Sequence, residues 1–199
     1  MVTRMNLLAA THRGLSGPPK RRVLGITLVE TLTVITIVAI LLTIGIPMFT
    51  YVSNANRMSS EVNGLLGDMM YARSEAIKEG QTVSICSSAN PSAAAPTCSG
   101  STTWQSGWIV FSDVNGNGAV SAGDTILRVQ RQFSARDTFN ASNGMSVVTF
   151  NREGFALGLA NSVLVTLHAV VPNPSTTRCL AISIVGQLKI VGSGTGGCA

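Results

Sequence analysis

The sequence predicts an α+β protein in which one long helix carries an antiparallel, β-rich domain. Residues 26–46 are predominantly apolar, and Glu30 is the only charged residue among them. From residue 54 to residue 79, apolar side chains recur at intervals of three and four, the period of an amphipathic helix. Residues 80–199 contain short apolar runs separated by Gly, Ser, Asn and Pro, which is typical of strands and turns.

The apolar segment is long enough to cross a bilayer as a helix, because a span needs about 20 apolar residues. Lys20, Arg21 and Arg22 precede it, and no acidic residue occurs from residue 1 to residue 25. Basic residues that flank a span remain on the cytoplasmic side of the membrane. The sequence therefore predicts a single-pass membrane protein whose N-terminus is cytoplasmic and whose larger, C-terminal part is exported.

The net charge of +5 and the pI of about 9.4 come from the residues before the span. The basic residues that precede Ile26 are Arg4, Arg13, Lys20, Arg21 and Arg22. Without them, the 14 basic residues of the chain no longer outnumber its 9 acidic ones. The basic balance therefore indicates membrane topology rather than a polyanionic ligand.

The helix is predicted to continue through residues 48–79 as an amphipathic segment. Its apolar stripe comprises Met58, Val62, Leu65, Leu66, Met69, Ala72, Ala76 and Ile77. We interpret this stripe as the face that packs on the domain rather than as a groove for a partner. Gly80 is the expected helix stop.

The domain after the helix is predicted to be built from short strands. The predicted strands are residues 81–86, 108–111, 127–133, 147–150, 155–157, 163–171, 179–185 and 188–191. Arg131 interrupts the apolar face of the third of these, which predicts a strand at the edge of a sheet. Residues 151–154, Asn-Arg-Glu-Gly, are predicted to form a hairpin-like turn.

Four cysteines, Cys86, Cys98, Cys179 and Cys198, follow the span and would face an oxidising compartment. They show no CxxC spacing and no histidine cluster accompanies them, which argues against zinc. Four cysteines allow three pairings, and we favour the two local disulfides, Cys86–Cys98 and Cys179–Cys198. Each would restrict the unfolded chain and stabilise the fold by about 3 kcal/mol.

One polar loop has the spacing of a calcium-binding loop. Asp113, Asn115, Asn117, Gly118 and Asp124 match positions 1, 3, 5, 6 and 12 of that motif. Only two of these residues are charged, position 12 is Asp rather than Glu, and the flanking segments are predicted strands. We therefore favour a structural turn, with calcium binding as the lesser alternative.

No constellation for catalysis is evident. His12 lies before the span and His168 stands alone in an apolar strand. The sequence has no GxSxG motif and no phosphate-binding loop. We expect a protein without enzymatic activity and without a cofactor.

The segment Gly25-Ile26-Thr27-Leu28-Val29-Glu30, followed by the apolar run, resembles the class III signal of type IV prepilins and type II secretion pseudopilins. The resemblance implies that prepilin peptidase cuts after Gly25 and N-methylates Ile26, which stands where Phe is usual. It divides the chain into a leader (1–25), a transmembrane helix (26–47), its amphipathic continuation (48–79) and a head (80–199). An ordinary signal anchor is the alternative.

The same resemblance gives roles to two residues of the helix. Glu30 would pair with the free amine of a neighbouring subunit's first residue, and Pro47 would kink the helix. The alternative for Glu30 is a shallow position at the membrane surface. A carboxylate inside lipid is costly unless it is protonated or paired, which favours the pairing role.

Motifs in the middle of the chain resemble the GspH/FimT group of minor pseudopilins and minor pilins. They are Ala72–Ile77, Gly107–Asp113, Asn115–Gly118 and Ile126–Arg128, with weaker similarity at Gly154 and Gly186. The resemblance implies a subunit of the bacterial inner membrane with its head in the periplasm. It also implies assembly into a type II secretion pseudopilus, with other pseudopilin or pilin subunits, prepilin peptidase and the inner-membrane assembly platform as partners.

The alternative function is that of a FimT-like minor pilin, which primes a type IV pilus or binds DNA during uptake. FimT-type pilins carry a Gly-Arg-x-Arg loop, and the matching residues here are Gly186-Gln187-Leu188-Lys189. Lys189, with Arg178 nearby in sequence, would give only weak, salt-sensitive binding to nucleic acid. We therefore favour a strand turn with a solvated lysine.

Overall fold

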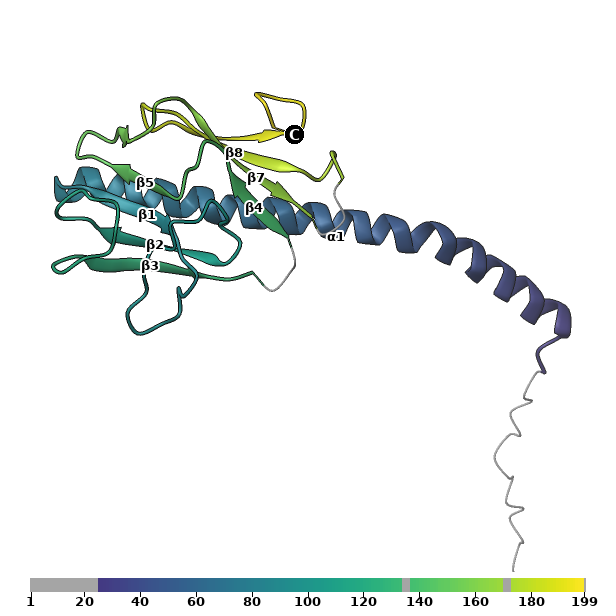
Figure 1. The fold of residues 1–199 in the computed structure, drawn as a ribbon. Helices are drawn as coiled ribbons and strands as arrows, with labels where there is room; N and C mark the ends of the chain where they lie inside the picture. The colour runs from purple at the N-terminus through teal and green to yellow at the C-terminus, as the bar shows by residue number, and fades with distance from the viewer. Residues whose placement is uncertain (1–24, 134–136, 170–172, 199) are drawn as a thin grey trace, which may run out of the picture. The chain divides into compact units, whose positions relative to one another are not determined.

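The computed structural model describes residues 25–133, 137–169 and 173–198 of the chain. They form one helix, α1 (Leu28–Glu79), followed by strands β1 to β9 (Figure 1). The predicted leader, including His12, lies outside the described residues except for Gly25. The described residues divide into two units, with the boundary between residues 44 and 45.

In the first unit, the helix begins at a capping residue. Thr27 precedes the first helical residue, and its Oγ1 accepts a hydrogen bond from the backbone N–H of Glu30 at 3.2 Å. This arrangement satisfies one of the unpaired donors at the helix N-terminus. Residues 25–44 are exposed, and the helix is long and apolar enough to cross a membrane. The predicted span is therefore helical and presents its apolar side chains outward.

The helix continues through Pro47 into the second unit and forms one side of the hydrophobic core there. The apolar side chains that it buries are Met58, Val62, Leu65, Met69, Ala72 and Ala76. Their spacing of three and four residues is that of one helix face, so the predicted stripe is confirmed. Ile77 is an exception: we expected it in the core, but it is 52% exposed because it lies at the margin of this face.

The first sheet has five antiparallel strands in the order β3-β2-β1-β5-β6. The strands are β1 (Val83–Ser87), β2 (Gly107–Ser112), β3 (Thr125–Arg131), β5 (Val147–Phe150) and β6 (Ala156–Leu157). All residues of β1 and β2 are buried, whereas β3 lies at the edge, as Arg131 predicts. The turn at residues 151–154 joins β5 to β6, and the Gly154 N–H donates to Asn151 O.

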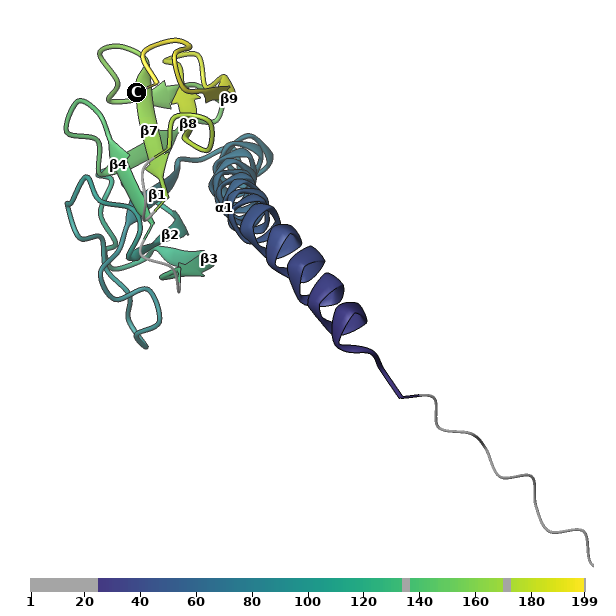
Figure 2. The same ribbon diagram turned by 90° about the vertical axis from the view of Figure 1, so that its right-hand side faces the viewer.

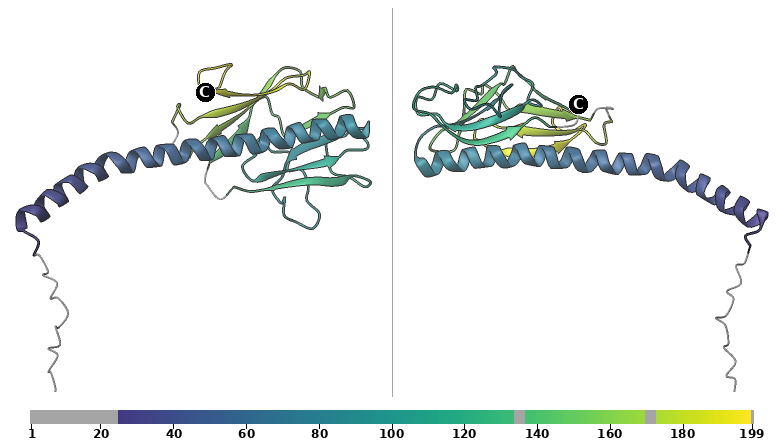
Figure 3. Two further views of the ribbon diagram at one scale, coloured as in Figure 1. Left: turned by 180° about the vertical axis from the view of Figure 1, so that it is seen from behind. Right: turned by 90° about the horizontal axis from the view of Figure 1, so that it is seen from below.

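The second sheet is also antiparallel, in the order β4-β7-β8-β9. Its strands are β4 (Thr138–Ala141), β7 (Val163–His168), β8 (Arg178–Ile182) and β9 (Leu188–Gly192). Figure 2 shows β7, β8 and β9 side by side, with β9 next to α1. Both sheets lie on the same side of the head portion of α1 (Figure 3). The predicted α+β fold is confirmed, including the long helix packed on an antiparallel head.

Strand β4 is the element that the sequence analysis did not predict. It spans four residues, of which only Phe139 is fully buried. Phe139 stacks on Phe133 with ring centroids 5.2 Å apart, and it also contacts Trp108. A four-residue strand with one large apolar side chain has too short a pattern to be distinguished from a loop.

Candidate functional site

The first candidate site is the N-terminal segment around Gly25, Ile26 and Glu30. Apart from its chain neighbours, no described residue has an atom within 4 Å of the position that a Cβ would occupy at Gly25, and Ile26 is 76% exposed. Within the described part of the chain, no packed element covers these two residues. Among the described residues, no side chain forms a hydrogen bond or an ion pair with the Glu30 carboxylate. A partner for this charge would have to come from another molecule or from the leader.

A second candidate site is a charged cluster on the head portion of α1. The Arg57 guanidinium donates to both carboxylate oxygens of Asp137, from Nε at 2.5 Å and from Nη2 at 2.9 Å. Glu61, one helical turn after Arg57, is only 6% exposed, and its Oε2 has no hydrogen-bond partner among the described residues. Burial, followed by the negative charge of Asp137, raises the pKa of Glu61 to about 7, whereas Arg57 opposes the shift.

This cluster predicts that the head loses stability as the pH rises. The pKa of Glu61 is about 4.5 in the unfolded chain and about 7 in the folded head. The contribution of Glu61 to stability is therefore fully present below about pH 4.5 and is lost as the pH rises through 7. This difference between the folded and unfolded pKa of Glu61 corresponds to about 3 kcal/mol of stability. We expect Glu61→Gln to leave the free energy of unfolding nearly unchanged at pH 4 and to raise it by about 2–3 kcal/mol at pH 8. Urea unfolding of the full chain in detergent measures both values.

Glu153→Gln is the matched control, because Glu153 is an exposed carboxylate that pairs with Arg152 on a turn. The hydrogen bond from Arg152 lowers the pKa of Glu153, so this carboxylate is ionised in both the folded and the unfolded state above about pH 6. Glu153→Gln should therefore leave the change in stability between pH 6 and pH 8 as it is in the unmodified chain. If the free energy of unfolding of Glu61→Gln changed with pH as it does in the unmodified chain from pH 4 to pH 8, the raised pKa assigned to Glu61 would be contradicted.

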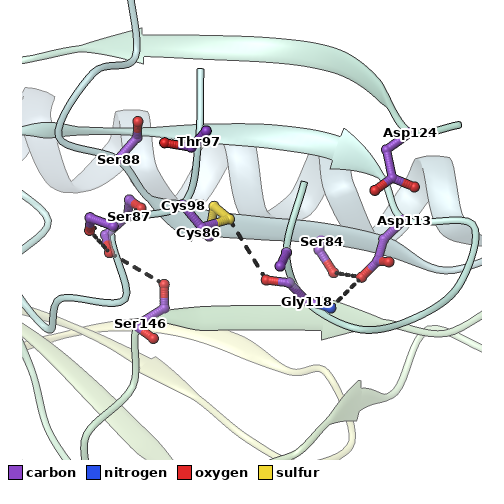
Figure 4. Close-up of a disulfide and its surroundings, with 12 residues drawn as sticks. Ser84, Cys86, Ser87, Ser88, Thr97, Cys98, Asp113, Gly118, Asp124 and Ser146 are labelled. Carbon is purple, nitrogen blue, oxygen red and sulfur yellow. Dashed lines mark hydrogen bonds between the residues drawn. A yellow bond between two sulfur atoms is a disulfide. The ribbon is translucent and has the colours of Figure 1, made fainter. Parts of the chain in front are cut away.

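The loop that resembles a calcium-binding motif is closed by its own side chains. Asp113 is buried, and its carboxylate accepts hydrogen bonds from Ser84 Oγ at 2.7 Å, from the Gly118 N–H at 2.8 Å and from the Asn117 N–H at 3.1 Å. Figure 4 shows the contacts of Asp113 with Ser84 in β1 and with Gly118 in the turn. The side-chain oxygen of Asn115 also accepts from the Asn117 N–H.

Asp124 closes the other end of this loop. Its carboxylate accepts from the N–H and the hydroxyl of Ser121 at 2.8 and 2.7 Å, and from the Val114 N–H at 3.0 Å. Burial opposes ionisation, but these hydrogen bonds lower the pKa of Asp124 below its usual value. Over the described ranges, no three His, Cys, Asp or Glu side chains gather to hold a metal ion. The contacts support the structural turn that the sequence analysis favours.

Both disulfides of the head join the cysteine pairs that the sequence analysis favours. Cys86 in β1 is bonded to Cys98, 12 residues later, and Cys179 in β8 is bonded to Cys198, 19 residues later. The first lies beside the Asp113 turn, as Figure 4 shows. Each closes a short loop, which stabilises the fold by about 3 kcal/mol in the chain-entropy account.

The structure does not bring Arg178 and Lys189 together. Arg178 pairs with Gly192 across β8 and β9, whereas Lys189 pairs with Ala181. Because side chains alternate along a strand, the two cations project from opposite faces of the sheet. The Arg178 guanidinium also donates to the carbonyl oxygens of Ser175 and Thr177. These two residues therefore form no common basic surface for nucleic acid.

His168 is at the end of β7, and its Nδ1 lies 3.4 Å from the Thr177 hydroxyl. No carboxylate or thiol accompanies it in the hydrogen-bond and ion-pair network of the described residues. The arrangement is that of a half-buried strand histidine, in agreement with the sequence analysis.

Three residues of the motifs quoted above meet at one junction. Arg73 on α1 donates from Nε to the carbonyl oxygen of Gly154 at 2.9 Å. Gly186, in the β8–β9 turn, packs so tightly that a Cβ there would lie 2.0 Å from the same carbonyl oxygen. Gly154 and Gly186 have φ angles of 82° and 73°, which favour glycine. Helix α1, the β5–β6 turn of the first sheet and the β8–β9 turn of the second sheet thus contact one another at the Gly154 carbonyl group.

Sequence reasoning missed the Arg57–Asp137 pair and the burial of Glu61. The spacing of Arg57 and Glu61 shows that they are neighbours on the helix. Asp137, however, is 80 residues away from Arg57 in the sequence. No local pattern connects them, so only the folded structure reveals the cluster.

Comparison with known proteins gives the following matches. The sequence model of a family described as type II transport protein GspH matches residues 61–187. A crystal structure of the type IV minor pilin FimU of Pseudomonas aeruginosa in space group P21 is similar, with a TM-score of 0.54 and 20% identity. The similarity covers 70% of this chain and 92% of FimU. A second FimU crystal structure, in space group P65, has a TM-score of 0.48 and 18% identity. It covers 72% of this chain and 94% of FimU. No curated protein matches significantly.

Proposed function

The chain belongs to the GspH family, and from that premise we propose that it is a minor pseudopilin of a type II secretion system. In this proposal it assembles with other pseudopilins into the periplasmic pseudopilus that drives protein export. The match of the family model to residues 61–187 carries the proposal. The likeness to FimU supports the pilin-like fold and does not distinguish between a secretion system and a type IV pilus.

The N-terminal helix supplies the mechanism of assembly in this proposal. Cleavage after Gly25 removes the basic leader and leaves the apolar helix on the mature subunit. The helix anchors the subunit in the inner membrane until it enters the filament, where it packs against the helices of other subunits. Its exposed apolar surface over residues 28–44 supports this role, because such a surface is stable only in lipid or against another apolar surface.

The proposed location of the head is the periplasm. The basic residues before the helix favour a cytoplasmic N-terminus, which places the residues after the span outside. Two disulfides in the head agree with an oxidising compartment. The buried carboxylates and the closed loops serve the fold of the head, so we assign the subunit a structural rather than an enzymatic role.

Deletion of the gene in its own bacterium tests the proposed function. We expect secreted enzymes to accumulate in the periplasm, while surface pili and DNA uptake stay at the level of the parent strain. Mass spectrometry of the mature protein should give N-methylated isoleucine, Ile26, as the first residue. Loss of pili or of DNA uptake with normal secretion would instead assign the chain to a type IV pilus.

A further inference from the structure

A groove of about 650 Å³ lies between α1 and the turn that leads into β9. Met70 and Ile77 form its helix wall, and Val185 and Leu188 form the opposite wall. Met70 is 57% exposed and Val185 is 50% exposed, so the groove leaves apolar side chains in contact with water. Of the described residues that line it, only Arg73 is charged.

The charge of Arg73 is not neutralised within the described part of the chain. Its Nε donates to the Gly154 carbonyl oxygen, and no described carboxylate lies within ion-pair distance of its guanidinium. An arginine has five N–H donors, so about four remain for another partner. A half-buried guanidinium beside apolar walls favours a carboxylate, which it can bind through two parallel hydrogen bonds.

The groove borders the open edge of β9. In the order β4-β7-β8-β9, only one side of β9 is paired among the described strands. Ser183 and Gln187 are a hydrogen-bonded pair, because the Ser183 N–H donates to Gln187 O at 3.0 Å. Along antiparallel strands, hydrogen-bonded residue pairs alternate with pairs that are not hydrogen-bonded to each other, and Leu188 and Ile190 belong to the second kind. The N–H and C=O groups of Leu188 and Ile190 therefore point away from β8. Such an edge can accept one more strand through backbone hydrogen bonds.

We propose that this groove binds an extended segment of a neighbouring protein subunit that carries a carboxylate. The segment adds as a strand to β9, through the backbone groups of Leu188 and Ile190. Its carboxylate binds the guanidinium of Arg73, and an adjacent apolar side chain packs between Met70 and Val185. The open edge selects the extended conformation, and the uncompensated charge of Arg73 selects the acidic residue. The inference rests on the proposed function, because a subunit of an assembly supplies the strand.

Peptide binding to the full chain in detergent micelles, with 13C-labelled methionine methyl groups, tests this proposal. The probes are pools of acetylated hexapeptides with Val, Ile, Leu and Thr varied at five positions and Glu or Gln fixed at the third. We expect the Glu pool to shift the Met70 methyl resonance, which Met70→Leu assigns. The affinity for the Gln pool should be at least tenfold lower. Backbone N-methylation of the Glu pool should abolish the shift, because it removes the donors that pair with β9.

Protein variants give a second comparison. Arg73→Gln should weaken binding of the Glu pool at least tenfold, and Arg73→Lys, which keeps the charge but loses the planar fork, should weaken it less. Arg152→Gln, at an exposed turn arginine, should leave the affinity unchanged. The peptide comparison does not depend on how well these variants fold.

Equal affinity for the Glu and Gln pools, unchanged binding after N-methylation, or no Met70 shift at millimolar peptide would each overturn the proposal. Failure of the proposed function is recognised separately. It would appear as normal secretion in the deletion strain, and it would leave the affinity of the purified chain for the peptides as measured.

Discussion

Glu30→Ala should reduce incorporation of the subunit into the assembled filament at least tenfold while leaving its insertion into the inner membrane unchanged. The structure shows no partner for the Glu30 carboxylate among the described residues, although the residue lies within the apolar helix. A buried carboxylate costs several kcal/mol unless a cation or a proton neutralises it. In the assembled state, the proposed partner is the N-terminal amine of a neighbouring subunit. Removing one side of such a pair leaves the other charge uncompensated.

The measurement is the ratio of filament-associated to membrane-associated subunit after shearing and fractionation. Thr36→Ala is a suitable control, because the Thr36 hydroxyl bonds to the Leu32 carbonyl oxygen within the same helix and carries no charge. It should assemble like the unmodified chain. Normal incorporation of Glu30→Ala would show that the carboxylate stays at the membrane surface and plays no part in assembly.

Gly186→Ala is expected to destabilise the head by about 2–4 kcal/mol. About 1 kcal/mol comes from placing a non-glycine residue at a φ of 73°. The remainder comes from the contact with the Gly154 carbonyl oxygen, 2.0 Å from the added Cβ, because backbone must move to relieve it. That carbonyl also accepts the hydrogen bond from Arg73, so the movement would loosen the junction between α1 and both sheets.

Gly194→Ala separates these two contributions. Gly194 has a φ of 79°, close to that of Gly186, but apart from its chain neighbours no described residue has an atom within 4 Å of the position of its Cβ. It should therefore cost only the conformational strain of about 1 kcal/mol. Urea unfolding of the full chain and its variants, under oxidising conditions, gives both values. Equal losses of stability in the two variants would mean that the close approach of the two turns contributes nothing.

Arg73, Gly154 and Gly186, which lie where the sequence resembles the GspH/FimT group, all belong to the junction, and Arg73 and Gly186 also line the groove. The two glycines allow the turns of different sheets to approach one another, and Arg73 fastens one of them to the helix. The same approach leaves Arg73 in the lining of the groove beside β9. One cluster of residues thus stabilises the head and shapes the surface that we propose for a neighbouring subunit.

Local patterns along the chain were enough to predict the helix, its division into an apolar and an amphipathic part, most strands and the favoured disulfide pairs. The period of Met58, Val62 and Leu65 defines one helix face, and alternation in residues 163–168 defines a strand. The resemblance of the middle motifs predicts the GspH family, whose sequence model matches residues 61–187. Each of these features depends on residues that are close together in the sequence.

The folded structure was needed to establish which distant residues meet. It buried Glu61 beside an ion pair between residues 80 positions apart, and it placed Arg178 and Lys189 on opposite faces of a sheet. It also exposed Ile77, gave β4 its partner β7 and left the edge of β9 open among the described strands. Local periodicity fixes the face of each element, whereas strand order and packing fix its neighbours. Whether a charge is buried or paired, which residues line a groove and which strand edge stays unpaired all depend on those neighbours, which lie far apart along the chain.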